Sequence, residues 1–146
     1  IQFSFYLIYP TTKMNEVDKI AFIHIVNGKI LSTRTRGCNK FYIPGGKREA
    51  RETDEETLVR EVKEELAVNI IRKTISYLGT FQAQSDGATK GVIVKMTCYT
   101  ADYSGNLKAS SEIEELRWLD TSDLDIISEV DKKIFAFLKT EGLLTI

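Results

Sequence analysis

Between Gly46 and Val68, one glycine, one arginine and four glutamates stand at offsets that limit how this chain can fold and act. The segment reads GKREARETDEETLVREVKEELAV, and we call it the box segment. Its pattern is G-x5-E-x7-R-E-x-x-E-E. Even with glutamate at a local frequency of about 40%, chance would give this pattern in roughly one alignment in ten thousand. The pattern residues are Gly46, Glu52, Arg60, Glu61, Glu64 and Glu65.

The second half of the box segment has the periodicity of an amphipathic helix. Leu58, Val62 and Leu66 recur every four residues and predict one buried stripe. Asp54 is the expected N-cap, and the acids that follow it complement the helix dipole in the first turn. The spacing therefore predicts a helix from about Asp54 to Leu66.

Three acids of this helix share a face away from the apolar stripe. Glu61, Glu64 and Glu65 are related as i, i+3 and i+4, so their carboxylates repel one another unless a cation lies among them. Oxygen ligands suit hard cations such as Mg²⁺, which commonly bridges carboxylates and substrate phosphates. The alternative is a solvated surface helix, stabilised by an i,i+4 pair of Glu56 with Arg60. The preceding glycines and the spacing favour the metal site.

The pattern resembles the signature box of the Nudix hydrolases, which cleave a diphosphate attached to another group X. The lead-in PGGK at residues 44–47 and the aliphatic residues Val62 and Val68 also match. Ala67 departs from the resemblance, because the family has a glycine there. Alanine costs about 1 kcal/mol where φ must be positive. We expect Asn69 to take over the turn that ends the helix.

The resemblance implies a role for each matching residue. The metal ligands are expected to be the main-chain carbonyl of Gly45 and the carboxylates of three glutamates. Arg60 is expected to orient the acids through an ion pair with Glu52. The cofactor implied is Mg²⁺, with Mn²⁺ as a substitute. The three glutamates are Glu61, Glu64 and Glu65, of which Glu61 and Glu64 are also expected to act in catalysis with Arg60.

The general base is open between two residues. Glu61 is one candidate, and the other is Glu112 in the later segment SSEIEELRWLD, where the family often carries an acid before a strand with Arg-Trp. An exposed acidic loop is an equal alternative for that segment. Substrate contacts are expected from Arg34, Lys47, Gly46 and Tyr42, with solvated side chains as the alternative for Arg34 and Lys47. Tyr42 is the candidate for stacking on a base.

Composition and charge indicate one ordinary domain. The chain has 146 residues, of which 42% are hydrophobic and 28% charged, which suits a single domain with a sizeable core. A net charge of −1 and the lack of a basic run give no reason to expect nucleic acid binding. Cys38 and Cys98 are too few for a disulfide framework and weakly indicate a cytoplasmic protein. The apolar residues 1–10 are too short to span a bilayer.

The remaining periodicity predicts strands and a second helix. We expect strands over residues 19–26, 29–36, 41–43, 70–84 (with a break near Lys73), 91–101 and 116–119. Turns are expected at 27–28, at the PGG sequence, at 85–87 and at 104–106, a short helical turn at 121–123, and a helix at 131–141. This order fits an α+β or α/β fold with a mixed sheet, and it is consistent with the Nudix α/β/α sandwich that the resemblance implies. Residues 18–146 are expected to form the domain, and residues 1–17 an extension whose first thirteen residues lie upstream of a natural start at Met14.

The expected reaction is metal-dependent hydrolysis of a nucleoside triphosphate, standard or oxidised, to the monophosphate and pyrophosphate. ADP-ribose or a nucleotide sugar is the alternative substrate, although the proline typical of that subfamily is absent from YLGTFQAQSDG. A Nudix-fold module that senses a nucleotide without cleaving it is the rival class. The partner is thus a small molecule, with no membrane, and the protein is expected to be a monomer or a homodimer.

Overall fold

The computed structural model describes residues 15–85 and 91–145. Residues 1–13, expected to lie upstream of the natural start, are therefore outside the described residues. Residues 86 and 87 of the expected turn at 85–87 are outside them too. Strands are β1 (Asn15–Phe22), β2 (Ile25–Val26), β3 (Lys29–Thr35), β4 (Gly45–Lys47), β5 (Asn69–Ile70), β6 (Ser76–Gln84), β7 (Val92–Thr100), β8 (Tyr103–Ser104) and β9 (Ile113–Leu119). Helices are α1 (Asp54–Leu66) and α2 (Glu129–Thr140), with 3₁₀ turns η1 (Arg72–Thr74) and η2 (Thr121–Ile126).

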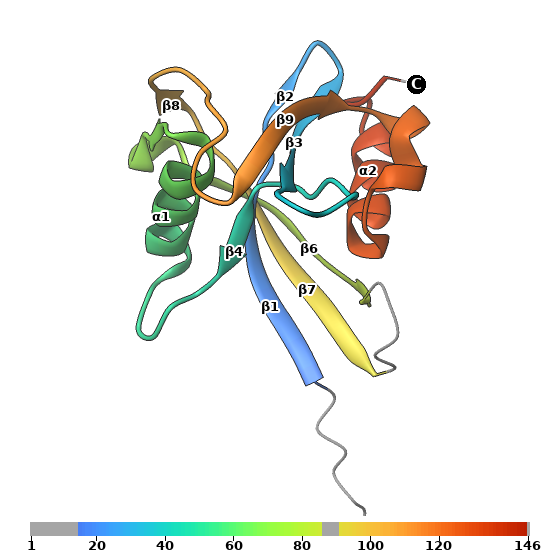
Figure 1. Cartoon of the computed structure of the whole chain (residues 1–146), viewed down its shortest axis with the longest axis horizontal. Helices are drawn as coiled ribbons and strands as arrows, with labels where there is room; N and C mark the ends of the chain where they lie inside the picture. The colour runs from blue at the N-terminus through green and yellow to red at the C-terminus, as the bar shows by residue number, and fades with distance from the viewer. Residues whose placement is uncertain (1–14, 86–90, 146) are drawn as a thin grey trace, which may run out of the picture.

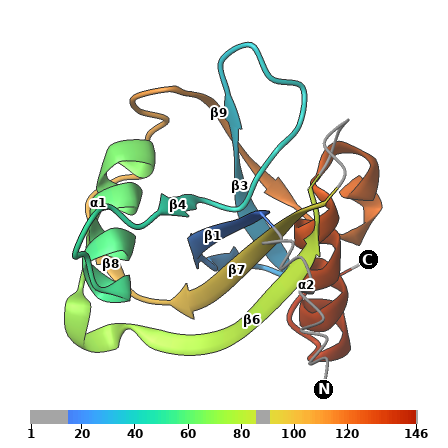
Figure 2. The ribbon, with the colours of Figure 1, turned by 90° about the horizontal axis from the view of Figure 1, so that it is seen from below.

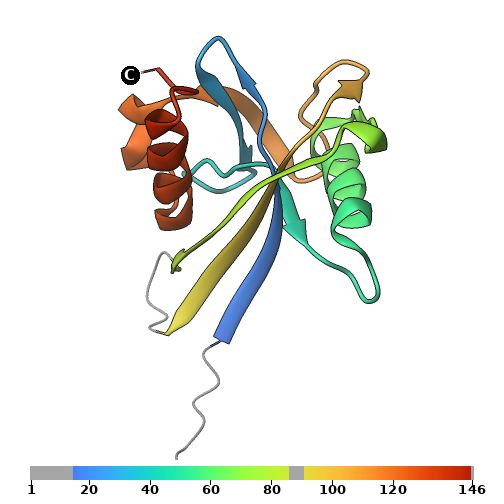
Figure 3. The same cartoon turned by 180° about the vertical axis from the view of Figure 1, so that it is seen from behind.

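Two sheets form the centre of the molecule. The larger has the order β4-β1-β7-β6, in which β1 and β7 run parallel and the other pairs antiparallel. The smaller is antiparallel, with the order β2-β3-β9. Helices α1 and α2 lie on opposite sides of these strands in both face-on views (Figures 1 and 3). The view from below shows the same two outer layers (Figure 2). The expected α/β/α sandwich with a mixed sheet is confirmed.

Alternation along β1 explains why both faces of the sheet are covered. Ile20 and Phe22 belong to the core cluster beneath α1, whereas Ala21 and, one residue beyond the strand, Ile23 belong to the cluster beneath α2. Successive side chains of a strand point to opposite faces, so a strand that is apolar at each of these positions requires a cover on each side. No helix in the described part of the chain is both long and apolar enough to cross a bilayer.

The first expected strand is in fact two. β1 begins at Asn15, three residues before the expected domain boundary, and pairs with β7 as far as Phe22. After a break at residues 23–24, the chain continues as β2, which pairs with β3 in the other sheet. The prediction of one strand over 19–26 was wrong because hydrophobicity does not reveal the change of partner.

The PGG sequence was predicted as a turn, but its glycines begin strand β4. Gly45 pairs with Ala21 and Gly46 with Ile20 across the edge of the larger sheet. Gly45 has a φ of 144°, and a Cβ there would overlap the carbonyl oxygen of Ile20. Only glycine allows this close approach of two strands. The approach fixes the start of the box segment against the centre of the sheet.

The ends of the two helices differ from the prediction by one or two residues. The N-cap of α1 is Thr53, whose hydroxyl accepts a hydrogen bond from the Glu56 amide, and Asp54 is the first helical residue. Ala67 itself adopts the left-handed conformation (φ 57°, ψ 28°), so Asn69 does not take over that turn and lies in β5. Helix α2 starts at Glu129, two residues early, because the Ser128 hydroxyl caps it.

Candidate active site

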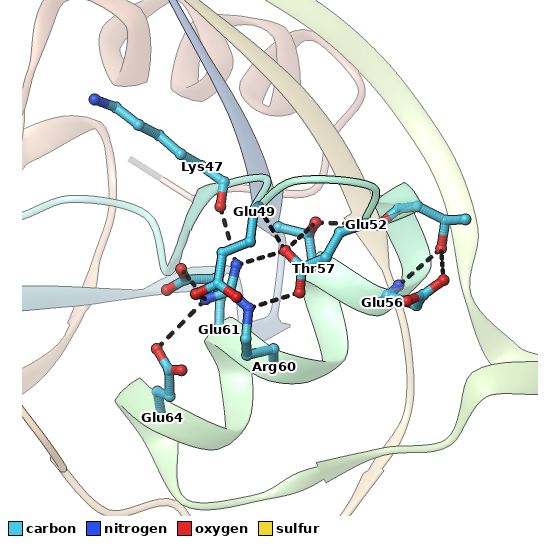
Figure 4. Close-up of polar contacts among 9 residues, drawn as sticks. Lys47, Glu49, Glu52, Glu56, Thr57, Arg60, Glu61 and Glu64 are labelled. Atoms are coloured by element: carbon cyan, nitrogen blue, oxygen red, sulfur yellow. Dashed lines mark hydrogen bonds and ion pairs between the residues drawn. The ribbon is translucent and has the colours of Figure 1, made fainter.

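Arg60 ties the helix of the box segment to the loop before it. Its Nε and Nη2 each donate a hydrogen bond of 2.7 Å to the carboxylate of Glu52, and Nη2 also donates to the Lys47 carbonyl at 3.0 Å (Figure 4). The Thr57 hydroxyl and the Glu49 amide donate to the same carboxylate. The hydrogen bonds from Arg60 above all lower the pKa of Glu52 to about 2. The pairing expected from the sequence is present.

The third nitrogen of the Arg60 guanidinium faces the acidic side of α1. Nη1 donates to Glu61 at 2.8 Å and lies 3.6 Å from a carboxylate oxygen of Glu64. The Glu64 carboxylate is half exposed and directed toward Arg60 (Figure 4). A single cation thus balances several acids on adjacent turns and in the preceding loop.

Glu61 lies directly against Gly46. A Cβ on Gly46 would lie 2.5 Å from the carboxyl carbon of Glu61, so no larger residue fits there without moving this carboxylate. Burial raises the pKa of Glu61, although Arg60 opposes the shift. The glycine of the pattern is therefore explained by the space that a catalytic candidate occupies.

Glu65 is the most enclosed acid of the site. Only 5% of the residue is exposed, and the Gly45 amide donates a hydrogen bond of 2.9 Å to its Oε1. Burial raises the pKa of Glu65 to about 8, and repulsion from Glu61 and Glu112 adds to the shift. A carboxyl group in such surroundings favours a proton or a metal ion as partner.

A cavity of about 400 Å³ opens beside these acids. Gly45, Glu65 and Glu112 line it on the side of the box segment, and Tyr42 also lines it. Apolar side chains from β1, β7 and α2 form much of the remaining wall, including Val17, Val94, Met96 and Val130. Polar side chains from β3, β6 and α2 complete the wall, and a cleft of this size suits a small-molecule ligand.

The loop that carries Glu112 is fastened to the end of α1. The amides of Lys108 and Ser110 donate to the carbonyls of Leu66 and Glu65, two acceptors that the end of the helix leaves available. From the other side, the Arg36 amide donates to the Glu112 carbonyl at 2.9 Å. Hydrogen bonding by Ser111 lowers the pKa of Glu112, so this carboxylate is ionised near neutrality.

Comparison with known proteins finds a family that matches most of the chain. The family model described as NUDIX domain matches residues 17–138. The chain belongs to the Nudix family. The match covers most of the chain and includes the whole box segment, Glu112 and most of α2.

Proteins from several organisms are similar to this chain in sequence or in fold. An ADP-ribose pyrophosphatase of Methanocaldococcus jannaschii is 33% identical over 99 residues, which make up 68% of this chain and 56% of that protein. The chain thus matches little more than half the length of that relative. The E. coli ORF135 protein superposes with a TM-score of 0.67 at 26% identity, covering 91% of this chain and 97% of the other. A MutT protein of Methanosarcina mazei Go1 has a TM-score of 0.69 at 17% identity, covering 89% and 97%, and shows the fold alone.

The acids of the Nudix box are of the chemical type that binds a divalent metal. Burial and mutual repulsion raise the pKa of both Glu61 and Glu65, and a hard cation would relieve that repulsion. Within residues 15–85 and 91–145, however, no three His, Cys, Asp or Glu side chains converge on a common point. Glu61 and Glu64 instead face Arg60. The donor set fits a metal in its chemistry, and Arg60 contacts one carboxylate oxygen of each of these two glutamates.

The expected substrate contacts are divided between the cavity and its surroundings. Tyr42 lines the cavity and is 37% exposed. Arg34 alternates along β3 with the cavity-lining Thr33 and Thr35, and its guanidinium pairs with Glu114 and Glu115 at 3.1 Å each. The ammonium of Lys47 points away from the acids around Arg60 (Figure 4).

Sequence reasoning missed three charged residues that line the cavity, Lys19, Glu129 and Asp131. Asp131 is 1% exposed, and its Oδ2 accepts a hydrogen bond from the Ile43 amide at 3.0 Å. An acid within the apolar stripe of Ile134 and Phe135 was a signal that could have identified it. His24, in contrast, stacks on Phe22 and contacts the Tyr103 ring.

Proposed function

We propose that this Nudix protein hydrolyses a nucleoside diphosphate linked to another group X and that it requires a divalent cation. One observation carries the proposal: Gly45, Glu65 and Glu112 line one cavity, and Glu61 lies beside them against Gly46. That arrangement borders a space of about 400 Å³ with the acids that the Nudix box contributes. The volume suits a small-molecule substrate.

The roles follow the chemistry of each group. Glu61, Glu64, Glu65 and the Gly45 carbonyl are the proposed ligands of Mg²⁺ or Mn²⁺, which would supply charge neutralisation at the diphosphate when bound. Arg60, held by Glu52, keeps Glu61 in place. Glu61 or Glu112 accepts the proton of the attacking water.

Glu61 and Glu112 are both candidates for the general base, and their pKa values are shifted in opposite directions. The raised pKa of Glu61 brings this carboxyl nearer to the pH at which a base works best, whereas the lowered pKa of Glu112 keeps that group ionised. Tyr42 is the proposed stacking partner of a base. Arg34 and Lys47 are proposed to contact phosphate, which for Arg34 requires release of Glu114 and Glu115.

Two substrate classes are supported. A nucleoside triphosphate, cleaved to monophosphate and pyrophosphate, is the expectation from the small single domain. ADP-ribose is favoured by the similarity to the ADP-ribose pyrophosphatase of Methanocaldococcus jannaschii. Both contain the diphosphate that the proposed metal site would engage, so the substrate class has to be measured.

The test is product release with Mg²⁺, then with Mn²⁺, from nucleoside triphosphates, oxidised nucleotides, ADP-ribose, nucleotide sugars and dinucleoside polyphosphates. We expect cleavage of one class, and a loss of at least about 10²-fold in Glu64→Gln, because the neutral amide cannot replace a carboxylate ligand. Glu55→Gln on the exposed first turn of the same helix is the matched control and should retain turnover. Wild-type turnover in Glu64→Gln would remove Glu64 from the metal site.

If folded protein binds a nucleotide but cleaves no compound of the panel, that result would instead support the sensing module.

A further inference from the structure

Lys19 lies where three strands meet beside the candidate active site. It pairs in register with Lys47 of β4 on one side and with Met96 of β7 on the other. Its side chain lines the cavity, together with Glu65 and Glu112. Its ammonium nitrogen lies 6.0 Å from the centre of the Tyr42 ring, which lines the same cavity. Lys19 stands outside the box segment, and no motif marks it.

Acidic residues outnumber basic ones on the wall of the cavity, although the Glu129 carboxylate pairs with Lys132 and burial raises the pKa of Glu65 to about 8. The described residues that line it include four acids, Glu65, Glu112, Glu129 and Asp131, and a single lysine or arginine, Lys19. A diphosphate would bring further negative charge into this space. A bound metal would offset part of that charge at the box acids, and Lys19 is the cationic side chain on the wall at β1.

Lys19 also differs from nearby arginines in its ion pairing. Arg34, Arg48 and Arg60 each pair with at least two carboxylates. In the part of the chain that the structure describes, the Lys19 ammonium has no carboxylate within 4.0 Å. The ammonium lies near the Tyr42 ring, and its charge opposes the rise in the pKa of Glu65.

We propose that Lys19 binds the diphosphate group of the substrate as a point charge on the wall of the cavity. This inference rests on the function proposed above and adds a contact that the Nudix box does not supply. An ammonium on a flexible stem suits a phosphate that shifts between substrate and product, because it does not impose the fixed fork of an arginine. Affinity should then increase with the number of phosphates on the ligand.

The test measures binding instead of turnover, so it does not depend on the reaction. Isothermal titration in EDTA at low salt, where charge interactions are least screened, gives the affinities of adenosine, AMP and ADP. We expect the wild-type protein to bind ADP more tightly than AMP, and AMP more tightly than adenosine. In Lys19→Met, the ratio of the ADP affinity to the adenosine affinity should fall about tenfold. Lys19→Arg should retain most of it.

Lys95→Met is the matched control. Lys95 lies on the neighbouring strand β7, between Val94 and Met96, which line the cavity, so its side chain points to the opposite face. The substitution removes the same charge without touching the cavity. Thermal unfolding of each variant verifies that the fold is intact. The salt dependence of ADP binding should become shallower in Lys19→Met but not in Lys95→Met.

Each outcome decides the inference. An unchanged affinity ratio in folded Lys19→Met, an equal loss in Lys95→Met, or a wild-type protein that does not distinguish ADP from adenosine would overturn it. Failure of the proposed function is seen separately. If the wild-type protein hydrolyses nothing but prefers ADP, and Lys19→Met loses that preference, Lys19 remains a phosphate-binding residue. Hydrolysis with an unchanged ratio would remove only Lys19.

Discussion

The guanidinium of Arg60 and the carboxylate of Glu52 are joined by two hydrogen bonds of 2.7 Å. This pair connects the loop before α1 to the middle of the helix, and the remaining nitrogen of Arg60 holds Glu61. The planar fork of arginine makes both connections at once, which a lysine cannot do. Arg60 therefore sets the position of the acidic face through Glu52.

For Arg60→Lys we predict a loss of turnover of about 10²-fold with the fold retained, because Glu61 loses its fixed position. Glu52→Gln should show a loss of similar size. Since the two residues act as a unit, the double variant should be little worse than either single variant. Steady-state kinetics with thermal unfolding measure this, and additive losses in the double variant would show that the two residues act independently.

Gly45 and Gly46 should respond differently to alanine. In Gly46→Ala the new methyl group meets the Glu61 carboxylate, a movable side chain, so we expect a folded protein with turnover reduced by at least about tenfold. In Gly45→Ala the methyl group meets the main chain of Ile20, and a φ of 144° is unfavourable for alanine, so destabilisation by several kcal/mol is expected. Denaturant unfolding and kinetics of both variants test the contrast. Equal stability of the two would contradict it.

Ala67→Gly should stabilise the protein. Ala67 has a φ of 57°, a conformation that costs alanine about 1 kcal/mol relative to glycine. We expect a gain of about 0.5–1 kcal/mol and a rise in Tm of about 2–4 °C. Exposed Arg51, with a φ of 67°, offers a second site at which glycine should help. Ala136→Gly, inside α2, is the opposite control and should lower Tm, because glycine is unfavourable within a helix.

Asp120 should make stability depend on pH in the acid range. Hydrogen bonds from the Ser122 hydroxyl and amide, with the Lys29 ammonium at 3.0 Å, lower the pKa of Asp120 to about 2. The ordinary pKa in the unfolded chain is about 3.9, so the stabilisation is complete above that pH and is lost as pH falls toward 2. Because Lys29 is half exposed, we expect a loss on the order of 1 kcal/mol.

Denaturant unfolding between pH 5 and 2 measures that loss, with Asp120→Asn as the comparison. Asparagine retains the capping geometry at the start of η2 but does not titrate, so its stability should fall less steeply with acid. Identical pH profiles of the two proteins would show that other carboxyl groups account for the acid sensitivity.

The general base can be assigned from two variants. Glu61→Gln and Glu112→Gln should both bind substrate, but only the loss of the base should remove the acidic limb of the pH profile of kcat. Stopped-flow or steady-state rates across pH, at saturating substrate, provide the comparison. A limb that persists in both variants would exclude both residues as the base.

The sequence by itself determined the features that depend on near neighbours. Leu58, Val62 and Leu66 are all fully buried, as their four-residue spacing predicts, because a helix places such residues on one face whatever surrounds it. The pairing of Arg60 with Glu52 was likewise predicted from the resemblance to the family. The order of the elements indicated a mixed sheet with two main helices, and the resemblance to the family implied the α/β/α sandwich.

The tertiary structure alone decided what depends on distant segments. The strand formed by Gly45–Lys47 exists because β1 pairs with it, and the PGG sequence without that partner predicts a turn. Glu112 borders the cavity because its loop is bonded to the last carbonyls of α1, and Lys19 does so because β1 lies between β4 and β7. Such contacts are set by packing and main-chain pairing between remote parts of the chain, which local periodicity does not encode.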